Sequence, residues 1–238
     1  MCIRMVIRQI KKRKLIFLVL SIIIIPSVIF LFCIFSPIER QPHSSVLIDT
    51  TELRNGDLLF RNGNGGESRL ITSISNGDYS HIAMAYRDSE GWKAVHAVPG
   101  ETENIKDTDY LKSEAIEDFY KHERANGGAI AKVNCHDSIA NKALAFALNK
   151  VKRKFVFDHN YRLADTTEYY CTELIYQAYI TVGINLADDR RHELPMPSTE
   201  GRFIFPSDIL CSPHISTIKV LPTAINDSLT TEQYTRYK

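Results

Sequence analysis

The chain has 238 residues, of which 44% are hydrophobic and 24% are charged. This composition is typical of a folded protein and excludes an intrinsically disordered chain. With 29 basic and 28 acidic residues, the formal net charge is +1. No basic stretch in the body of the chain has the aromatic interleaving of a nucleic-acid surface. We therefore expect one folded domain with additional segments and no nucleic-acid partner.

The N-terminus differs from the rest of the chain. Residues 1–14 form a basic flank with six lysines and arginines, and residues 15–35 are almost wholly apolar. The apolar stretch has about the length that a helix needs to cross a bilayer. The positive-inside rule keeps the basic flank in the cytoplasm. We therefore predict a single-pass membrane protein whose domain lies on the extracytoplasmic side, periplasmic or extracellular.

A cleaved signal peptide is the alternative for this segment, and Cys33 adds the alternative of a lipoprotein signal. A signal peptide normally has a shorter apolar core and small residues at its cleavage site. The apolar stretch instead ends without an Ala-x-Ala pattern, and bulky Phe32 precedes Cys33. These features favour an anchor that is not cleaved.

The folded domain is predicted over residues 51–221, between a linker at 36–50 and a polar tail at 222–238. Its predicted elements are a strand at 58–60, a glycine-rich loop at 61–68, a hairpin of strands 80–86 and 92–98, a helix at 113–122, a strand at 129–134, helices from 137 and from 171, and a strand at 214–221. This mixed order predicts an α+β fold with an antiparallel sheet packed against helices.

Cys171 opens the last of these helices, whose apolar residues recur at helical spacing from Leu174 to Val182. The unpaired N–H groups and the dipole at a helix start stabilise an anion. We expect this position to lower the pKa of the thiol and to supply a thiolate near neutral pH. Taken alone, however, a cysteine at a helix start is most often a small buried residue.

Two histidines lie on the predicted hairpin. If the turn centres on Asp88–Ser89, His81 falls directly opposite His96 on one face of the sheet, while a bulge at Gly91 would shift the register by one. His81 could then take the proton of Cys171, and His96 could orient His81. These are the nucleophile, base and orienter of thiol hydrolysis. Each histidine alone could equally be structural.

Two other interpretations use the cysteines and histidines differently. Cys171, His81 and His96 could hold zinc with an open fourth position, although the close ligand pairs of most zinc sites are missing from the sequence. Cys135 and Cys211 could form a disulfide in an oxidising compartment, although the sequence favours two unpaired, buried cysteines.

Four motifs in order resemble the YiiX/YaeF group of permuted papain-like amidases, which are related to NlpC-type peptidases and lecithin–retinol acyltransferases. The motifs are Gly56–Phe60, Tyr79–Met84, Tyr170–Ile175 and Pro206–Ile209. The resemblance spans about residues 51–221 and implies a permuted papain-like fold, in which the histidine strand precedes the cysteine helix. It implies Cys171 as nucleophile, His81 as base and N–H groups at the helix start as oxyanion donors. No metal or organic cofactor is implied.

The third catalytic position is often glutamate in this group, whereas the matching residue here is His96. We expect a membrane-anchored cysteine hydrolase, an amidase or peptidase, acting on an amide of the cell envelope such as a cell-wall peptide. One alternative is an acyltransferase or lipid acyl hydrolase that uses the same cysteine and histidine. The other is a non-catalytic, membrane-tethered binding domain.

Overall fold

The computed structural model describes residues 44–101, 107–163, 167–193, 202–225 and 228–229. All of them belong to the unit formed by residues 42–238. Within these ranges, no helix combines the length and apolar character needed to cross a bilayer. The predicted anchor at 15–35 lies outside the described residues.

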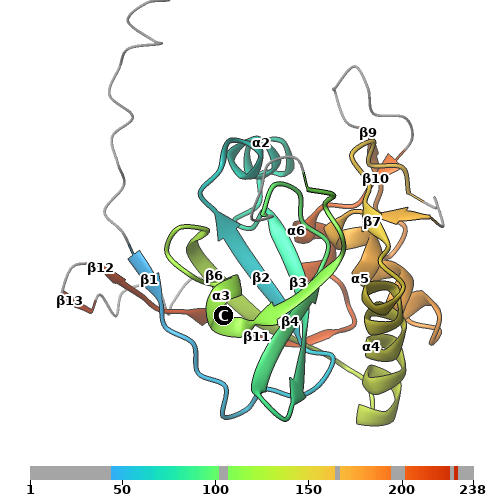
Figure 1. Cartoon of the computed structure of the whole chain (residues 1–238), viewed down its shortest axis with the longest axis horizontal. Helices are drawn as coiled ribbons and strands as arrows, with labels where there is room; N and C mark the ends of the chain where they lie inside the picture. Colours follow the sequence, from blue (N-terminus) through green and yellow to red (C-terminus); the bar gives the residue numbers. More distant parts are fainter. Residues whose placement is uncertain (1–43, 102–106, 164–166, 194–201, 226–227, 230–238) are drawn as a thin grey trace, which may run out of the picture. The chain divides into compact units, whose positions relative to one another are not determined.

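The described residues form both helices and strands, of differing lengths (Figure 1). The strands are β1 (Ser44–Val46), β2 (Leu58–Gly63), β3 (His81–Asp88), β4 (Gly91–His96), β5 (Lys112–Ala115), β6 (Ala125–Val133), β7 (Val156–Phe157), β8 (Glu168–Tyr169), β9 (His192–Glu193), β10 (Arg202–Phe203), β11 (Ile215–Leu221), β12 (Thr223–Ile225) and β13 (Ser228–Leu229). The helices are α2 (Gly66–Ser75), α3 (Ile116–Phe119), α4 (Asp137–Lys152), α5 (Cys171–Ile180) and α6 (Pro206–Leu210). Their mixed order is the predicted α+β arrangement.

A six-stranded antiparallel sheet, in the order β11-β6-β2-β3-β4-β5, forms the centre of the domain (Figure 1). Side chains alternate between its two faces, as the pleat requires. On β3, Ile82 and Met84 join one apolar cluster, whereas Ala83 and Ala85 join another. Helices α4 and α5 pack on the first cluster, and α3 with β1 packs on the second. Both faces of the central strands are therefore buried.

The structure corrects the helix predicted at residues 113–122. Lys112–Ala115 instead forms β5, which pairs with the edge of β4, and only Ile116–Phe119 is helical. Pairing with an existing strand outweighs the weak local helix preference of this segment. The loop predicted at 61–68 is also shorter than expected, because β2 extends to Gly63 and α2 begins at Gly66.

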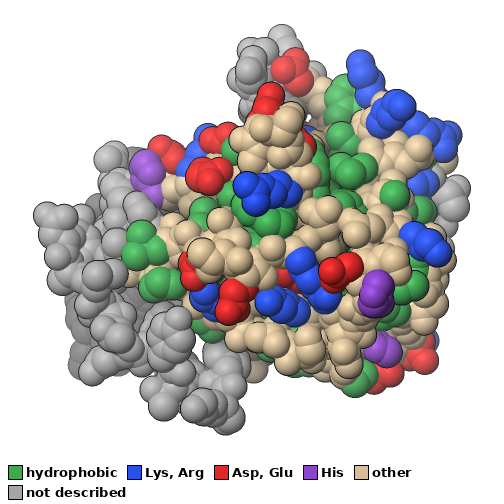
Figure 2. Space-filling model, turned by 90° about the horizontal axis from the view of Figure 1, so that it is seen from below, with side chains coloured by type: hydrophobic (Ala, Val, Ile, Leu, Met, Phe, Trp, Pro, Cys, Tyr) green, Lys and Arg blue, Asp and Glu red, His purple; other side chains and the backbone are tan. Residues whose placement is uncertain are grey.

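Both ends of the described chain carry additional strands. Strand β1 lies in the stretch predicted as a linker, and β12 lies in the stretch predicted as a polar tail. The two strands pair antiparallel, with Ser45 opposite Ala224. On the face drawn in Figure 2, acidic and basic side chains are mixed over the centre of the domain, as expected for a net charge of +1.

The three cysteines of the domain are free thiols. Cys135 is half-buried after β6, and Cys211 is exposed directly after α6. The disulfide considered between these two residues is therefore not formed, and both cysteines are unpaired. Cys171 is buried at the first residue of α5.

Candidate active site

The start of α5 is fixed to a neighbouring backbone segment by its own side chains. The Thr172 hydroxyl donates to the carbonyl of Ile204 at 2.5 Å, and the Ile204 N–H donates to the Tyr170 hydroxyl at 3.2 Å. These residues are all buried. Cys171, which lies between Tyr170 and Thr172, is therefore held in one place at the N-terminal end of the helix.

The Cys171 thiol differs from the expected thiolate. Burial raises the pKa of Cys171 to about 12, although hydrogen bonds from the N–H groups of Ile82 and Thr172 oppose the shift. The field of the helix start, on which the expected thiolate rests, does not offset the loss of water around a buried anion. Because the Ile82 N–H belongs to the peptide that follows His81, the same hydrogen bond places the sulfur beside the first residue of β3.

The register of the hairpin places the two histidines on one face of the sheet. Met84 pairs with Val95, so His96 lies opposite Ala83 rather than opposite His81 as predicted. Because the centre of the turn lies one residue later in the chain than expected, the pairing between β3 and β4 is shifted by two residues. A shift of two keeps every side chain on its face, whereas a shift of one would reverse it. His81 and His96 are therefore diagonal neighbours.

A chain of hydrogen bonds crosses three adjacent strands. His81 Nε2 on β3 lies 2.8 Å from His96 Nδ1 on β4, and His96 Nε2 lies 3.0 Å from Glu114 Oε1 on β5. Both histidines are predicted from the sequence, whereas Glu114 is not, because β5 overlaps the helix predicted at 113–122. The signal that could have found it is the glutamate that the family often has at the third position.

The carboxylate at the end of this chain sets the tautomers of both rings. Although burial opposes the shift, the hydrogen bond from His96 and the charge of Lys112 hold the pKa of Glu114 well below its usual range. An ionised carboxylate only accepts hydrogen bonds, so His96 Nε2 carries the proton and His96 Nδ1 accepts from His81. The second nitrogen of His81, Nδ1, is then left with a lone pair.

Both rings are held in the neutral form. Burial lowers the pKa of His81 well below 6.5, and the charge of Arg61 adds to this shift. Burial also lowers the pKa of His96, although Glu114 opposes it. The two rings pack against Phe119, at 5.7 and 5.2 Å between centroids, and the Arg61 guanidinium lies 4.8 Å from the same ring. His81 can therefore accept a proton at neutral pH.

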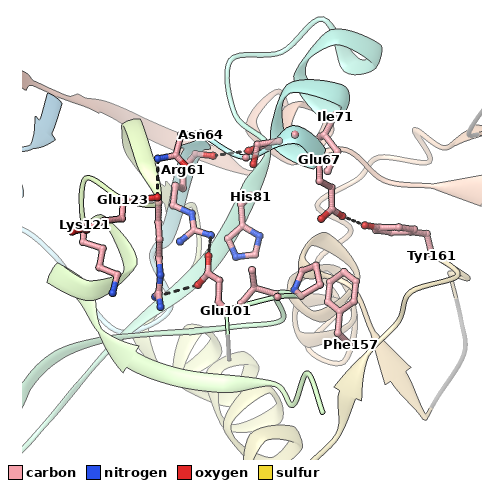
Figure 3. Close-up of a pocket in the computed structure, with 18 residues that line it drawn as sticks. Arg61, Asn64, Glu67, Ile71, His81, Glu101, Lys121, Glu123, Phe157 and Tyr161 are labelled. Carbon is pink, nitrogen blue, oxygen red and sulfur yellow. Dashed lines mark hydrogen bonds and ion pairs between the residues drawn. The ribbon is translucent and has the colours of Figure 1, made fainter. Parts of the chain in front are cut away.

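A pocket of about 600 Å³ opens at His81 (Figure 3). In this view, Arg61 and Lys121 lie on one side of His81, and Glu67 and Tyr161 lie on the other. The Tyr161 hydroxyl donates to the Glu67 carboxylate. The volume is in the range of small-ligand sites.

Cys171 is 6% exposed, and it is not among the residues that line the pocket. In the described part of the chain, no hydrogen bond joins the Cys171 thiol to the His81 ring. The structure thus brings these two residues to the same corner of the domain, and it bonds His81 to His96. The contact between Cys171 and His81 itself is through the peptide at Ile82.

One group of side chains near His96 has the composition of a metal site. Ligand atoms of His96, Glu101 and Glu114 lie within 4.8 Å of one another. However, Lys112 and Arg124 each contact both carboxylates, at 2.8 to 3.1 Å. A divalent cation would be repelled by these two charges and would have to break the bond between His96 and Glu114. The group therefore does not fit a metal ion, and among the described residues the cysteine–histidine set does not converge either.

Comparison with known proteins identifies relatives of this arrangement. Residues 52–219 match the model of a family described as permuted papain-like amidase enzyme, YaeF/YiiX, C92 family. The crystal structure of the metalloprotein yiiX from Escherichia coli O157:H7 is similar, with a TM-score of 0.55 and 15% sequence identity. The similarity covers 72% of this chain and 96% of that chain, and at this identity it shows the fold alone. No match is found among curated proteins.

Proposed function

The chain belongs to the permuted papain-like amidase family, and on this premise we propose that it cleaves an amide through an acyl-enzyme on Cys171. The observation that carries the proposal is the hydrogen-bonded chain of His81, His96 and Glu114, whose first member directly precedes Ile82, the residue whose N–H bonds the Cys171 sulfur. A neutral, oriented base next to a thiol is the arrangement that nucleophilic catalysis requires. We propose His96 as the third member of the site, as predicted from the sequence, and we add Glu114 as the fourth.

In the first step, the proton of Cys171 moves to Nδ1 of His81, the nitrogen that His96 leaves free. This step requires the His81 ring, which packs against Phe119, to move within hydrogen-bond distance of the thiol when substrate binds. Catalytic hydrogen bonds are often longer in the free enzyme. The sulfur attacks the carbonyl carbon, and N–H groups at the start of α5 stabilise the oxyanion. His81 then gives its proton to the leaving amine, and a thioester remains on Cys171.

In the second step, water attacks the thioester while His81 takes the water proton. The C–S bond breaks, the carboxylic acid product leaves, and His81 returns a proton to the sulfur of Cys171. Each time His81 is protonated, its Nε2–H donates to His96, and His96 in turn donates to the Glu114 carboxylate. His96 and Glu114 therefore act as positioning residues that favour the imidazolium form.

This proposal assigns no step to a metal ion. The similar yiiX structure is described as that of a metalloprotein. In the present chain the converging carboxylates, Glu101 and Glu114, are already paired with Lys112 and Arg124. The proton transfers above need only protein side chains and water.

The proposal is tested by the intact mass of the protein after brief incubation with a cell-envelope extract and an acid quench. The wild type should gain an amino-acyl group on Cys171 that disappears with time, and Cys171→Ala should gain none. His81→Ala should also remain unmodified. A fatty-acyl adduct would instead support acyl transfer or lipid hydrolysis. Absence of any adduct on the folded wild type would contradict catalysis and favour a tethered binding domain.

The location of the domain is a further part of the proposal. Six basic residues precede the apolar residues 15–35, which supports a membrane anchor with the catalytic domain on the extracytoplasmic side. The substrate would then be an amide of the cell envelope. Charge reversal and reporter fusions test this orientation.

A further inference from the structure

Lys121 has an unusual place among the charged residues of the pocket. It lines the pocket on the same side of His81 as Arg61 (Figure 3). Arg61 contacts Glu101 at 2.6 Å, and Arg124 contacts the same carboxylate at 3.1 Å. By contrast, the Lys121 ammonium has no ion pair or side-chain hydrogen bond to any residue that the structure describes. Its charge is available to a ligand.

Cations outnumber carboxylates on this side of the pocket. The cations that line this side are Arg61, Lys121 and Arg124, and the carboxylates are Glu101 and Glu123. The side chain of Glu123 is 59% exposed and contacts His122 at 3.1 Å. An anion on this side of the pocket therefore meets an excess of one positive charge.

The opposite side of the pocket has a different character. Phe157, Tyr161 and Ile71 supply aromatic and aliphatic surface there. The carboxylate on this side, Glu67, already accepts the hydrogen bond of Tyr161. His81 lies between the two sides (Figure 3), so a substrate whose carbonyl is presented to His81 can reach the cationic side with one end.

We propose that Lys121 binds a carboxylate of the substrate and so makes the pocket selective for acidic amides. An ammonium group suits this role, since it offers three donors and a full charge on a stem that adapts to the ligand. That the bound carboxylate belongs to a substrate rests on the proposed function. The binding preference itself needs no catalysis and is measured separately.

The experiment compares two peptide amides of equal size, acetyl-Ala-Glu-amide and acetyl-Ala-Gln-amide, by calorimetric titration into full-length Cys171→Ala protein. The acidic peptide should bind about tenfold more tightly, which is the usual effect of a hydrogen bond to a charged group. The preference should shrink as salt is added. In the Cys171→Ala protein, the additional change Lys121→Gln should abolish the preference for the acidic peptide, whereas Lys121→Arg should retain part of it.

The matched control is Lys142→Gln, which removes the same charge from an exposed position on α4 and should leave the preference intact. Equal binding of the two peptides, no binding of the acidic one, or a preference that survives Lys121→Gln would overturn the inference. Failure of the proposed function is distinguishable, because the wild type would then form no acyl-enzyme while the Lys121-dependent preference persisted. Hydrolysis without any preference would reject the inference alone.

Discussion

The protonation of His81 depends on a neighbouring cation. Burial lowers its pKa well below 6.5, and Arg61 adds to the shift. His81 must be neutral to accept the Cys171 proton, so activity is present above this lowered pKa and is lost as pH falls through it. We predict that kcat/KM stays constant down to pH 6.5 and declines only at more acidic pH.

The Arg61→Gln variant tests the cause of this shift. Without the cation, the acidic limb of the pH profile should move upward, but it should stay below pH 6.5 because the burial of His81 remains. Lys142→Gln, on the exposed side of α4, should leave the profile unchanged. An acidic limb that already lies at 6.5 in the wild type would show that His81 is not the buried base that the structure describes.

Glu114 should matter for turnover more than for binding. Glutamine at this position keeps the size of the side chain but loses the charge and can donate to His96, which permits the wrong tautomer. We predict that Glu114→Gln lowers kcat by about 10²-fold or more with little change in KM. Glu117→Gln, an exposed change on α3, is the control. Steady-state kinetics measure the effect, once far-UV circular dichroism shows that the variants are folded like the wild type. Full activity of Glu114→Gln would show that Glu114 has no role in the site.

The position of Cys171 at a helix start suggests that it is the most reactive thiol, but its burial predicts that it reacts more slowly than Cys211. Cys171 is buried with its pKa raised to about 12, whereas Cys211 is exposed. Limiting iodoacetamide at neutral pH should therefore label Cys211 before Cys171, and labelling of Cys171 should increase with pH. Peptide mass mapping over time gives both rates. Faster labelling of Cys171 would mean that a thiolate is already present in the resting protein.

At the scale of the secondary-structure elements, β6 contains two adjacent glycines in different surroundings. A Cβ on Gly128 would lie 2.4 Å from Cε1 of Tyr120 and 3.0 Å from the carbonyl oxygen of Phe60. Tyr120 cannot easily move, because its hydroxyl donates to backbone carbonyls on both β2 and β6. A Cβ on Gly127 would approach only Asn62, at 3.9 Å.

Because of these different surroundings, we predict that alanine affects the stability of the protein differently at the two positions. Gly128→Ala should lower the free energy of unfolding by about 2 kcal/mol, since the added methyl overpacks a buried sheet. Gly127→Ala should change the free energy of unfolding by no more than about 0.5 kcal/mol. Alanine also reduces the conformational entropy of the unfolded chain, which favours the folded state. Urea unfolding of both variants measures the difference. Similar stabilities would show that the contact between Tyr120 and Gly128 does not constrain the sheet.

Local patterns account for the elements that carry Cys171 and His81. The apolar residues of α5 repeat at helical spacing, and β3 is a run of small and branched residues that is buried on both faces. The β3–β4 turn was misplaced by one residue, but a register change of two left both histidines on the predicted face. These parts of the fold could be predicted because neighbouring residues determine them.

The rest of the site depends on residues that are distant in the sequence. Glu114 lies on an edge strand whose pairing with β4 is not encoded by its own four residues, so the local sequence predicts a helix instead. The raised pKa of Cys171 follows from tertiary burial, and not from its position at a helix start. The influence of Arg61 on His81 likewise requires the pairing of β2 with β3.

At the scale of the whole molecule, the orientation of the chain across a membrane decides which substrates the site can reach. The basic flank at residues 1–14 should stay in the cytoplasm, and the folded domain should be exported. Alkaline phosphatase is active only after export, whereas green fluorescent protein exported in unfolded form does not fluoresce. A phosphatase fusion after Lys238 should therefore be active, and a fluorescent fusion at the same place should be dark.

The basic flank itself provides the control for this topology. Replacing its six lysines and arginines by glutamine, and adding lysines directly after residue 35, reverses the charge difference across the apolar segment without changing the segment. Because positive charge sets the orientation of a single span, the two reporters should exchange their signals. A wild-type chain with a bright fluorescent fusion and a silent phosphatase would place the catalytic domain in the cytoplasm. The site would then act on a cytoplasmic amide, and the proposal of a cell-envelope substrate would be wrong.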